Sequence, residues 1–188
     1  MFIHSYVENS ISNGPGERFV IWTQGCSIRC PCCFNVETHA FNKGEQIKTS
    51  NLVNLIKNKL YIEGVTISGG EPFDQKEELL LLVKEIRSNT SLSIIVYSGY
   101  EYNYLIKDTL NRNIIANIDV LIDGRFEKDK KSNKNYKGSI NQQLFFISNR
   151  YTKTDFENLN IIEFDFTSEG IINIIGFPSA EVNVNEFN

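Results

Sequence analysis

The sequence predicts an α/β protein, a partial parallel (β/α) barrel of about five or six strands in a single domain. Short apolar runs rich in β-branched residues alternate with amphipathic helical segments, which is typical of right-handed βαβ units. Polar and glycine-rich clusters follow several of these runs, where parallel sheets carry functional groups. The chain has 188 residues. A complete eight-stranded barrel typically needs roughly 250 residues, so we expect incomplete closure.

The first half of the chain carries predicted strands at residues 18–23 (RFVIWT), 64–68 (GVTIS) and 93–97 (SIIVY). A helix is expected from Thr49 or Ser50 to about residue 60, because a capping hydroxyl precedes apolar residues spaced along one face. A second helix is expected over residues 74–88. Its acidic side chains come early and its basic side chains late, as the helix dipole favours.

The second half begins with a short predicted helix over residues 102–110 and a strand over residues 118–122 (IDVLI). Later strand candidates are residues 144–148, 161–166 and 171–175. We expect one domain over residues 1–188, with the loop 124–138 and the acidic tail 178–188 as appendages.

Glycine or polar clusters stand at the ends of four predicted strands. They are Gln24-Gly25-Cys26, Ser68-Gly69-Gly70-Glu71, Ser98-Gly99 and Asp123-Gly124. The carboxyl ends of parallel strands meet at one edge of a sheet, so we expect these clusters to lie close together. This coincidence favours a catalytic role over a purely structural one.

The composition excludes several classes of protein. Hydrophobic residues make up 41% and charged residues 22%, as in a globular protein and not a disordered or collagen-like one. The net charge of −4 argues against nucleic acid as a partner. Since no apolar run approaches the roughly 20 residues of a membrane helix, and no secretion signal is found, we expect no membrane association and a cytoplasmic location. Clustered cysteines in that reducing compartment are typically metal ligands or catalytic groups.

Cys26, Cys30 and Cys33 form a C-x3-C-x2-C motif. Three thiolates on a short loop can hold three irons of a [4Fe–4S] cluster and leave the fourth iron open. Zinc is the competing metal, but a structural zinc site needs a fourth ligand, here Cys32 or His39. The spacing favours iron–sulfur and leaves zinc, or no metal, as alternatives.

The cysteine motif after one strand and Gly69-Gly70-Glu71-Pro72 after the next resemble the radical S-adenosylmethionine (SAM) superfamily. Within it, the chain resembles the activating proteins of anaerobic ribonucleoside-triphosphate reductases, which are glycyl-radical enzyme activases. The segments that carry this resemblance are WTQGCSIRCPCCFNVET (22–38), TISGGEPFDQ (66–75), VYSGY (96–100), VLIDGRF (120–126), KGSINQ (137–142) and Gly176-Phe177-Pro178.

The resemblance implies an oxidoreductase with a [4Fe–4S] cluster on Cys26, Cys30 and Cys33, whose open iron binds SAM. Reductive cleavage of SAM would give a 5′-deoxyadenosyl radical that removes hydrogen from a glycine of a large partner, an anaerobic ribonucleoside-triphosphate reductase. A flavodoxin-like or ferredoxin-like protein would supply the electron. No catalytic residue beyond the cluster and SAM is implied.

The resemblance also implies a set of SAM contacts. They are Phe34, Asn35, Ser68, Gly69, Gly70, Glu71, Ser98 and Asp123. The turn 68–71 would meet the methionyl amine, with Glu71 offering charge and the glycines allowing close approach. Ser98 would lie near the methionyl end or the ribose, while Phe34 and Asn35 would flank adenine.

Each of these residues also has an ordinary structural interpretation. Gly69-Gly70 and Asp123-Gly124 would build tight turns, Phe34 and Trp22 would be core aromatics, and Glu71 would be an anion at a helix N-terminus.

The chain also departs from the family pattern. Cys32 stands where the family often carries glycine, and it is either a bystander or an alternative ligand to Cys33. The segment 125–135 is unusually rich in lysine and asparagine. Because this region lies near the partner in activases, we expect the partner to dock near residues 125–137.

Two other functions remain open from the sequence. One is a small single-cluster radical SAM enzyme that acts on a small molecule or peptide; the other is a zinc-binding interaction module. The chain has no further cysteines for a second cluster. Its first expected strand starts at about residue 18, so we expect no peptide-recognition domain before it. Both absences favour the activase or a minimal small-molecule enzyme over a peptide modifier.

Overall fold

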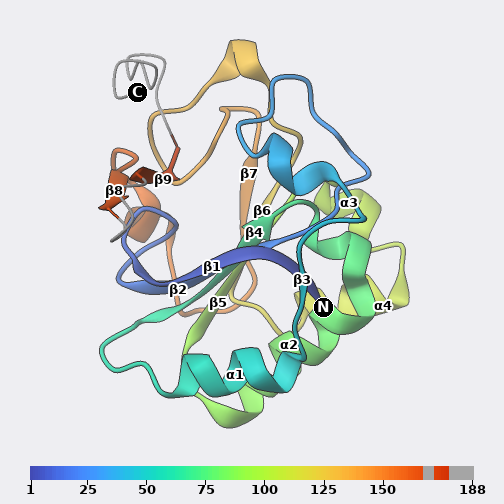
Figure 1. Cartoon of the computed structure of the whole chain (residues 1–188). Coiled ribbons are helices and arrows are strands. Elements are labelled where there is room, and N and C mark those ends of the chain that lie inside the picture. The colour runs from blue at the N-terminus through green and yellow to red at the C-terminus, as the bar shows by residue number, and fades with distance from the viewer. Residues whose placement is uncertain (167–171, 178–188) are drawn as a thin grey trace.

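In the part of the chain that the computed structural model describes, residues 1–166 and 172–177, seven strands form one sheet (Figure 1). Their order is β3-β1-β2-β4-β5-β6-β7. The parallel strands at its centre are β2 (Arg18–Thr23), β4 (Gly64–Gly69), β5 (Ser93–Ser98) and β6 (Val120–Asp123). Thr23 pairs with Gly69, and Ser98 pairs with Asp123, so the carboxyl ends of neighbouring strands lie level.

The outer strands are antiparallel, which corrects the expectation of a parallel sheet for residues 144–148. β7 (Gln143–Phe146) pairs antiparallel with β6, and β1 (Phe2–Ser10) pairs antiparallel with both β2 and β3 (Glu45–Gln46). The prediction of a first strand near residue 18 was wrong, because the polar strand β1 precedes it. β3 and β7 form open edges in the strand order, so the fold is a mixed α/β domain with a parallel centre.

The helices cover one face of the sheet, where Figure 1 shows α1, α2 and α4 grouped together. Their bounds are α1 (Thr49–Lys57), α2 (Lys76–Asn89), α3 (Tyr102–Leu105) and α4 (Thr109–Ile115). Short 3-10 helices lie at Val36–His39, Pro72–Gln75, Lys128–Lys130 and Lys153–Phe156. The single helix predicted over residues 102–110 is thus two helices. Within the described residues, no helix has both the length and the apolar character needed to cross a membrane.

The sheet separates two apolar clusters, because successive side chains of a strand point to opposite faces. On β5, Ile94 and Val96 pack in the cluster that includes α1 and α2. Ile95 and Tyr97 pack in a second cluster with Phe156 and Phe177. That second face is covered by the segments that follow β6.

A separate hairpin, β8 (Ile162–Phe166) and β9 (Ile172–Gly176), lies beside the main sheet. Both strands were predicted, but they pair with each other and join no strand of the main sheet. Glu163 anchors the hairpin, since its carboxylate accepts hydrogen bonds from the Ser10 hydroxyl and the Ser12 amide. Pro178 and the predicted acidic tail 178–188 lie outside the described residues.

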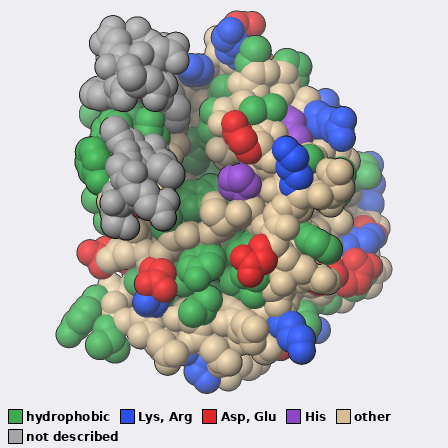
Figure 2. Space-filling view, in the orientation of Figure 1, with side chains coloured by type: hydrophobic (Ala, Val, Ile, Leu, Met, Phe, Trp, Pro, Cys, Tyr) green, Lys and Arg blue, Asp and Glu red, His purple; other side chains and the backbone are tan. Residues whose placement is uncertain are grey.

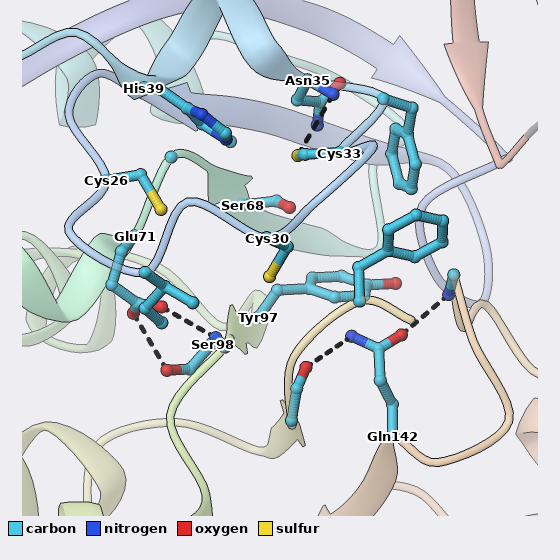
Figure 3. A pocket seen from close by; sticks show the side chains of 18 of the residues that line it. Cys26, Cys30, Cys33, Asn35, His39, Ser68, Glu71, Tyr97, Ser98 and Gln142 are labelled. Atoms are coloured by element: carbon cyan, nitrogen blue, oxygen red, sulfur yellow. Dashed lines mark hydrogen bonds between the residues drawn. The ribbon is translucent and has the colours of Figure 1, made fainter. Parts of the chain in front are cut away.

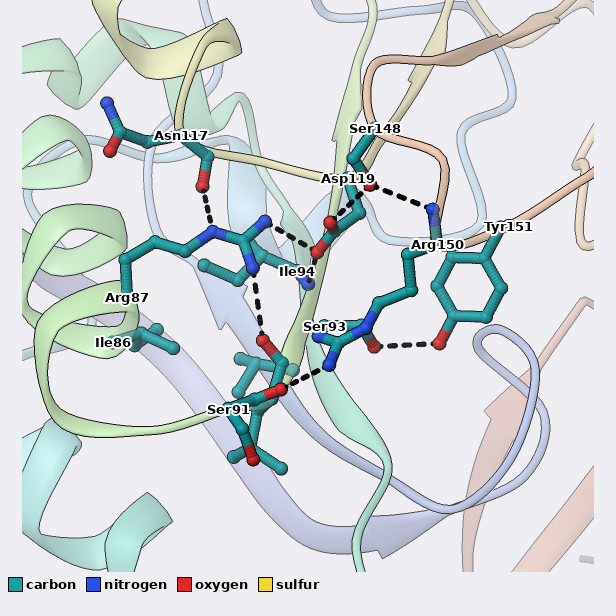
Figure 4. Close-up of polar contacts among 12 residues, drawn as sticks. Ile86, Arg87, Ser91, Ser93, Ile94, Asn117, Asp119, Ser148, Arg150 and Tyr151 are labelled. Carbon is teal, nitrogen blue, oxygen red and sulfur yellow. Dashed lines mark hydrogen bonds and ion pairs between the residues drawn. The ribbon is translucent and has the colours of Figure 1, made fainter.

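Asp119, the residue before β6, ties the amino end of this strand to its surroundings (Figure 4). Its buried carboxylate accepts hydrogen bonds from the Arg87 guanidinium at 2.6 Å, the Ile94 amide at 2.7 Å and the Ser148 hydroxyl at 2.6 Å. One side chain therefore joins α2, β5, β6 and the segment after β7.

We expect Asp119→Ala to lower the free energy of unfolding by about 3 kcal/mol, because it leaves the Arg87 cation and the buried Ile94 amide without their partner. Urea denaturation under anaerobic conditions measures the change. Glu157→Ala is the matched control, because it breaks only the exposed pair with Lys153 and should leave stability nearly unchanged. Equal stability of the Asp119 and Glu157 variants would contradict the stabilising role of the Asp119 hydrogen bonds.

Candidate active site

A pocket lies beyond the carboxyl ends of β2, β4, β5 and β6, and it gathers most of the predicted site residues. Those that line it are Cys26, Cys30, Cys33, Phe34, Asn35, Ser68, Gly69, Gly70, Glu71 and Ser98. The predicted convergence of strand-end clusters at one edge is confirmed for the first three clusters. From the fourth cluster, Gly124 lines the pocket.

The cysteine loop places three free thiols around this pocket. Cys26 is buried and Cys30 and Cys33 are half-buried. Figure 3 shows the three sulfur atoms around a shared space, with Ser68 and Glu71 nearby. The Gln24 side chain closes the loop by donating to the carbonyl oxygens of Glu37 and Ala40, at 3.0 and 2.7 Å.

The surroundings of the thiols fit a soft metal cluster. The Cys26 thiol accepts backbone hydrogen bonds from Ile28 and Arg29, and the Asn35 amide donates to the Cys33 sulfur at 3.4 Å. Such N–H donors stabilise sulfur in its anionic, metal-binding form. Burial nevertheless raises the pKa of both thiols, so a bound metal would have to displace their protons.

Cys32 differs from the other cysteines in backbone and exposure. Its side chain is exposed, and it is absent from the pocket lining. Its φ of +57° lies in the left-handed region that favours glycine. His39 does line the pocket. Within the described residues, no three His, Cys, Asp or Glu side chains gather closely enough to hold a single metal ion.

Gly69 and Gly70 bring the β4 turn into backbone contact with the start of the cysteine loop. The Gly70 amide donates to the Thr23 carbonyl at 2.8 Å, and the Glu71 amide donates to the Gly25 carbonyl at 2.9 Å. A Cβ on Gly70 would lie 2.2 Å from the Gly25 oxygen, and one on Gly69 would lie 2.4 Å from the Thr23 nitrogen. Gly69 also has a φ of +102°. From the sequence, we expected these glycines to let the backbone approach a ligand. In the structure, they also let the turn approach the backbone of residues 23–25.

Glu71 braces two strand-end turns against each other (Figure 3). Its buried carboxylate accepts from the Phe73 amide at 3.0 Å, the Gly99 amide at 2.7 Å and the Ser98 hydroxyl at 2.9 Å. Burial raises the pKa of Glu71 to about 7, although these hydrogen bonds oppose the rise. The Ser98 hydroxyl is therefore engaged by Glu71 in the protein itself.

The structure separates Asp123 from the other predicted contacts. Its carboxylate is buried and accepts from the Tyr102 amide at the start of α3. It lines a neighbouring hollow together with Tyr100 and Tyr104, and it is absent from the lining of the cysteine pocket. A turn-building role for Asp123, the ordinary alternative in the sequence, accounts for these contacts.

A hydroxyl–carboxylate triangle that the sequence did not indicate fixes the residue after Cys26. Asp74 accepts from the Ser27 amide at 2.7 Å, the Ser27 hydroxyl at 3.0 Å and the Tyr100 hydroxyl at 3.0 Å. The Ser27 and Tyr100 hydroxyls lie 2.8 Å apart. The cysteine loop is thereby joined to the segments that follow β4 and β5.

The opposite wall of the pocket was also missed. It includes Tyr97, Phe126, Gly138, Gln142 and Phe177. Phe34 packs edge-on against Phe126 and Phe177, with ring centroids 5.2 and 5.8 Å apart. The segments KGSINQ (137–142) and Gly176-Phe177 contributed to the family resemblance, but nothing in their residue types indicated a wall of this pocket.

The chain is similar to known proteins of one kind. Residues 12–145 match a family model described as a 4Fe-4S single cluster domain. The chain is 33% identical over 148 residues to the anaerobic ribonucleoside-triphosphate reductase-activating protein of Pasteurella multocida, which covers 74% of this chain and 94% of that protein. It is 32% identical over 149 residues to the protein of the same name from Enterobacteria phage T4, covering 76% and 92%. It is also 38% identical over 93 residues to the pyruvate formate-lyase-activating enzyme of Staphylococcus epidermidis, covering 46% of this chain and 37% of that enzyme.

We expect Gly70→Ala to disrupt the cysteine loop, because its Cβ would collide with the Gly25 carbonyl. The variant should retain less than about half of the wild-type iron after anaerobic reconstitution, with reduced thermal stability. Gly138→Ala is the control, since its Cβ would meet only side-chain atoms, at 3.3 Å or more. Wild-type iron content in the Gly70 variant would contradict the claim that this backbone contact holds the cysteine loop in place.

The raised pKa of Glu71 predicts a pH dependence of stability. Between pH 4.5 and about 7, Glu71 binds a proton in the folded protein and not in the unfolded chain. This extra proton binding stabilises the fold at low pH, and the stabilisation is lost as the pH rises to about 7. From about pH 5.5 to about pH 8, the free energy of unfolding should fall by about 2 kcal/mol more in wild type than in Glu71→Gln. Parallel pH profiles of the two proteins would show that Glu71 does not titrate in this range.

Proposed function

This chain belongs to the anaerobic ribonucleoside-triphosphate reductase-activating proteins, and on that premise we propose that it generates a glycyl radical on such a reductase. The observation that carries the proposal is the convergence of three free thiols and the Gly69–Glu71 turn on one pocket. The matching iron–sulfur domain supports iron over zinc in this loop.

The proposed cofactors are a [4Fe–4S] cluster and SAM. Cys26, Cys30 and Cys33 would hold three irons, and the missing fourth protein ligand would leave one iron free for SAM. When bound, the cluster supplies the electron that cleaves SAM reductively, and this chemistry provides the radical. The chain itself would hold the thiols in place and orient SAM through the residues that line the pocket.

The proposed SAM contacts follow the two ends of the pocket. The polar turn 68–71 suits the charged methionyl half, and Ser98 takes part through its hydrogen bond to Glu71. Phe34 and Asn35 border the pocket directly after the cysteines and suit adenine. Asp123 is also a proposed SAM contact. Its neighbour Gly124 lines the pocket, whereas Asp123 itself does not.

The proposed macromolecular partners are the reductase and a flavodoxin-like or ferredoxin-like electron donor. The open sheet edges support a partial barrel that leaves room for a glycine-bearing loop of the partner. Docking of the partner near residues 125–137 stays a proposal. Two of the lysines in this segment already have partners within the chain. Lys130 pairs with Glu127, and Lys137 donates to the Ile140 and Gln142 carbonyls.

The surface and the thiols support the remaining parts of the proposal. Among the described residues on the face shown in Figure 2, acidic and basic side chains are interspersed without a continuous basic surface, which suits a protein partner better than nucleic acid. The free thiols suit the reducing cytoplasm. We propose that residues 1–188 form one radical SAM core domain.

The test is electron paramagnetic resonance on an anaerobic mixture of reconstituted protein, reductant, SAM and the anaerobic reductase encoded nearest to it. We expect a glycyl radical doublet with wild type and with Cys32→Ala, and none with Cys26→Ala. Cys32 is the matched control, because it lies in the same loop but outside the pocket lining.

The controls also separate the alternatives. SAM cleavage without a doublet would favour action on a small molecule or peptide. Stoichiometric zinc without iron or sulfide would exclude a radical SAM enzyme and favour a zinc-binding interaction module. Loss of the doublet in Cys32→Ala equal to that in Cys26→Ala would refute the proposed ligand set.

A further inference from the structure

Gln142 pins both ends of a loop that forms one wall of the pocket, the wall segment (residues 124–142). Its Oε1 accepts from the Gly138 and Ser139 amides at 2.8 and 3.1 Å, and its Nε2 donates to the Gly124 carbonyl at 2.9 Å (Figure 3). All three partners are backbone groups. One side chain therefore fixes the distance between the start of the segment and the turn at residue 138.

The rest of the KGSINQ motif holds the same segment. The Asn141 amide nitrogen donates to the Arg125 carbonyl at 2.8 Å, and the Ser139 hydroxyl accepts from the Glu127 amide at 3.2 Å. The Lys137 ammonium donates to the Gln142 carbonyl at 3.0 Å. These side chains satisfy backbone groups within the wall segment, so the motif acts locally as an internal frame.

The frame sets the position of an aromatic surface. Phe126 and Gly138 belong to the wall segment and line the pocket, where both approach Phe34 of the cysteine loop. A Cβ on Gly138 would lie 3.3 Å from both the Phe126 and the Phe34 ring atoms. The two rings therefore lie close to the Gly138 backbone, and a shift of the segment would change its contacts with the Phe34 ring.

The two ends of the pocket differ in chemistry. Cys26, Cys30 and the 68–71 turn form a polar, thiol-bearing end, whereas Phe34, Phe126 and Phe177 give the other end an apolar, aromatic character. Figure 3 shows Gln142 across the pocket from Cys26. The flat aromatic base of a nucleoside suits the aromatic end, and a charged amino-acid group suits the polar end.

We propose that Gln142 is a positioning residue that holds the wall segment in place to receive the adenosyl half of SAM. The inference rests on the proposed function and deepens it. It requires that loss of the Gln142 bonds weaken adenosine recognition while the cluster and the methionyl end stay intact.

The experiment compares Gln142→Leu, Gln142→Glu and Gln143→Leu with wild type, all carrying the reconstituted cluster. Gln143 is the matched control, because it is the adjacent glutamine, is exposed and lies outside the pocket lining. Iron content is measured first and should be the same in all four proteins. Anaerobic calorimetry then gives the Kd for SAM and for 5′-methylthioadenosine, and the resonance signal of the reduced cluster reports methionine binding.

We expect Gln142→Leu to raise the Kd for SAM and 5′-methylthioadenosine about tenfold and to leave the response to methionine unchanged. Gln142→Glu keeps the two acceptor bonds and loses the donor, so its Kd should be intermediate. Gln143→Leu should match wild type.

Unchanged Kd values in Gln142→Leu would overturn the positioning role while leaving the proposed function standing. Loss of iron, or equal weakening of methionine and 5′-methylthioadenosine, would show a general structural role and would also overturn it. A wild-type protein that takes up no cluster and binds no SAM would reject the proposed function, and this inference with it.

Discussion

The site depends on one close contact between backbones. The turn Gly69–Glu71 lies directly against Thr23–Gly25, with hydrogen bonds of 2.8 and 2.9 Å and no room for a Cβ at either glycine. The parallel pairing of β2 with β4 brings the two turns level, and the absence of side chains lets them touch. Cys26 follows this contact immediately, so the contact fixes where the cysteine loop begins relative to the predicted SAM turn.

The other parts of the site are coupled to this contact through buried polar groups. Glu71 joins this turn to the end of β5 by accepting hydrogen bonds from Ser98 and Gly99. Asp74 joins the segment after the turn to the cysteine loop by accepting a hydrogen bond from Ser27. The Glu71 side chain is buried, and this burial raises the pKa of its carboxyl group. A buried carboxylate with three donors is costly to disturb, so the turns around the pocket keep one geometry.

The sequence predicted those features that follow from short-range patterns. The strand β2 was predicted to the residue, and β4, β5 and β6 within two residues, because each is a short apolar run ended by glycine or a polar residue. The cysteine triad follows from its spacing. The polar strand β1 was missed because its residues carry no apolar run. The Gln142 frame was also missed, since its partners are backbone amides and carbonyls that side-chain identity does not reveal. Asp123 was grouped with the site from its position at a strand end, but its carboxylate lies toward α3.

The central claim is that three thiols, held by this contact, support a cluster with one iron open to SAM. Mössbauer spectroscopy of protein reconstituted with iron-57 tests it most directly. We expect one of the four cluster irons to have a distinct signal, and this signal alone to shift when SAM is added. Four equivalent irons that do not respond to SAM would contradict it.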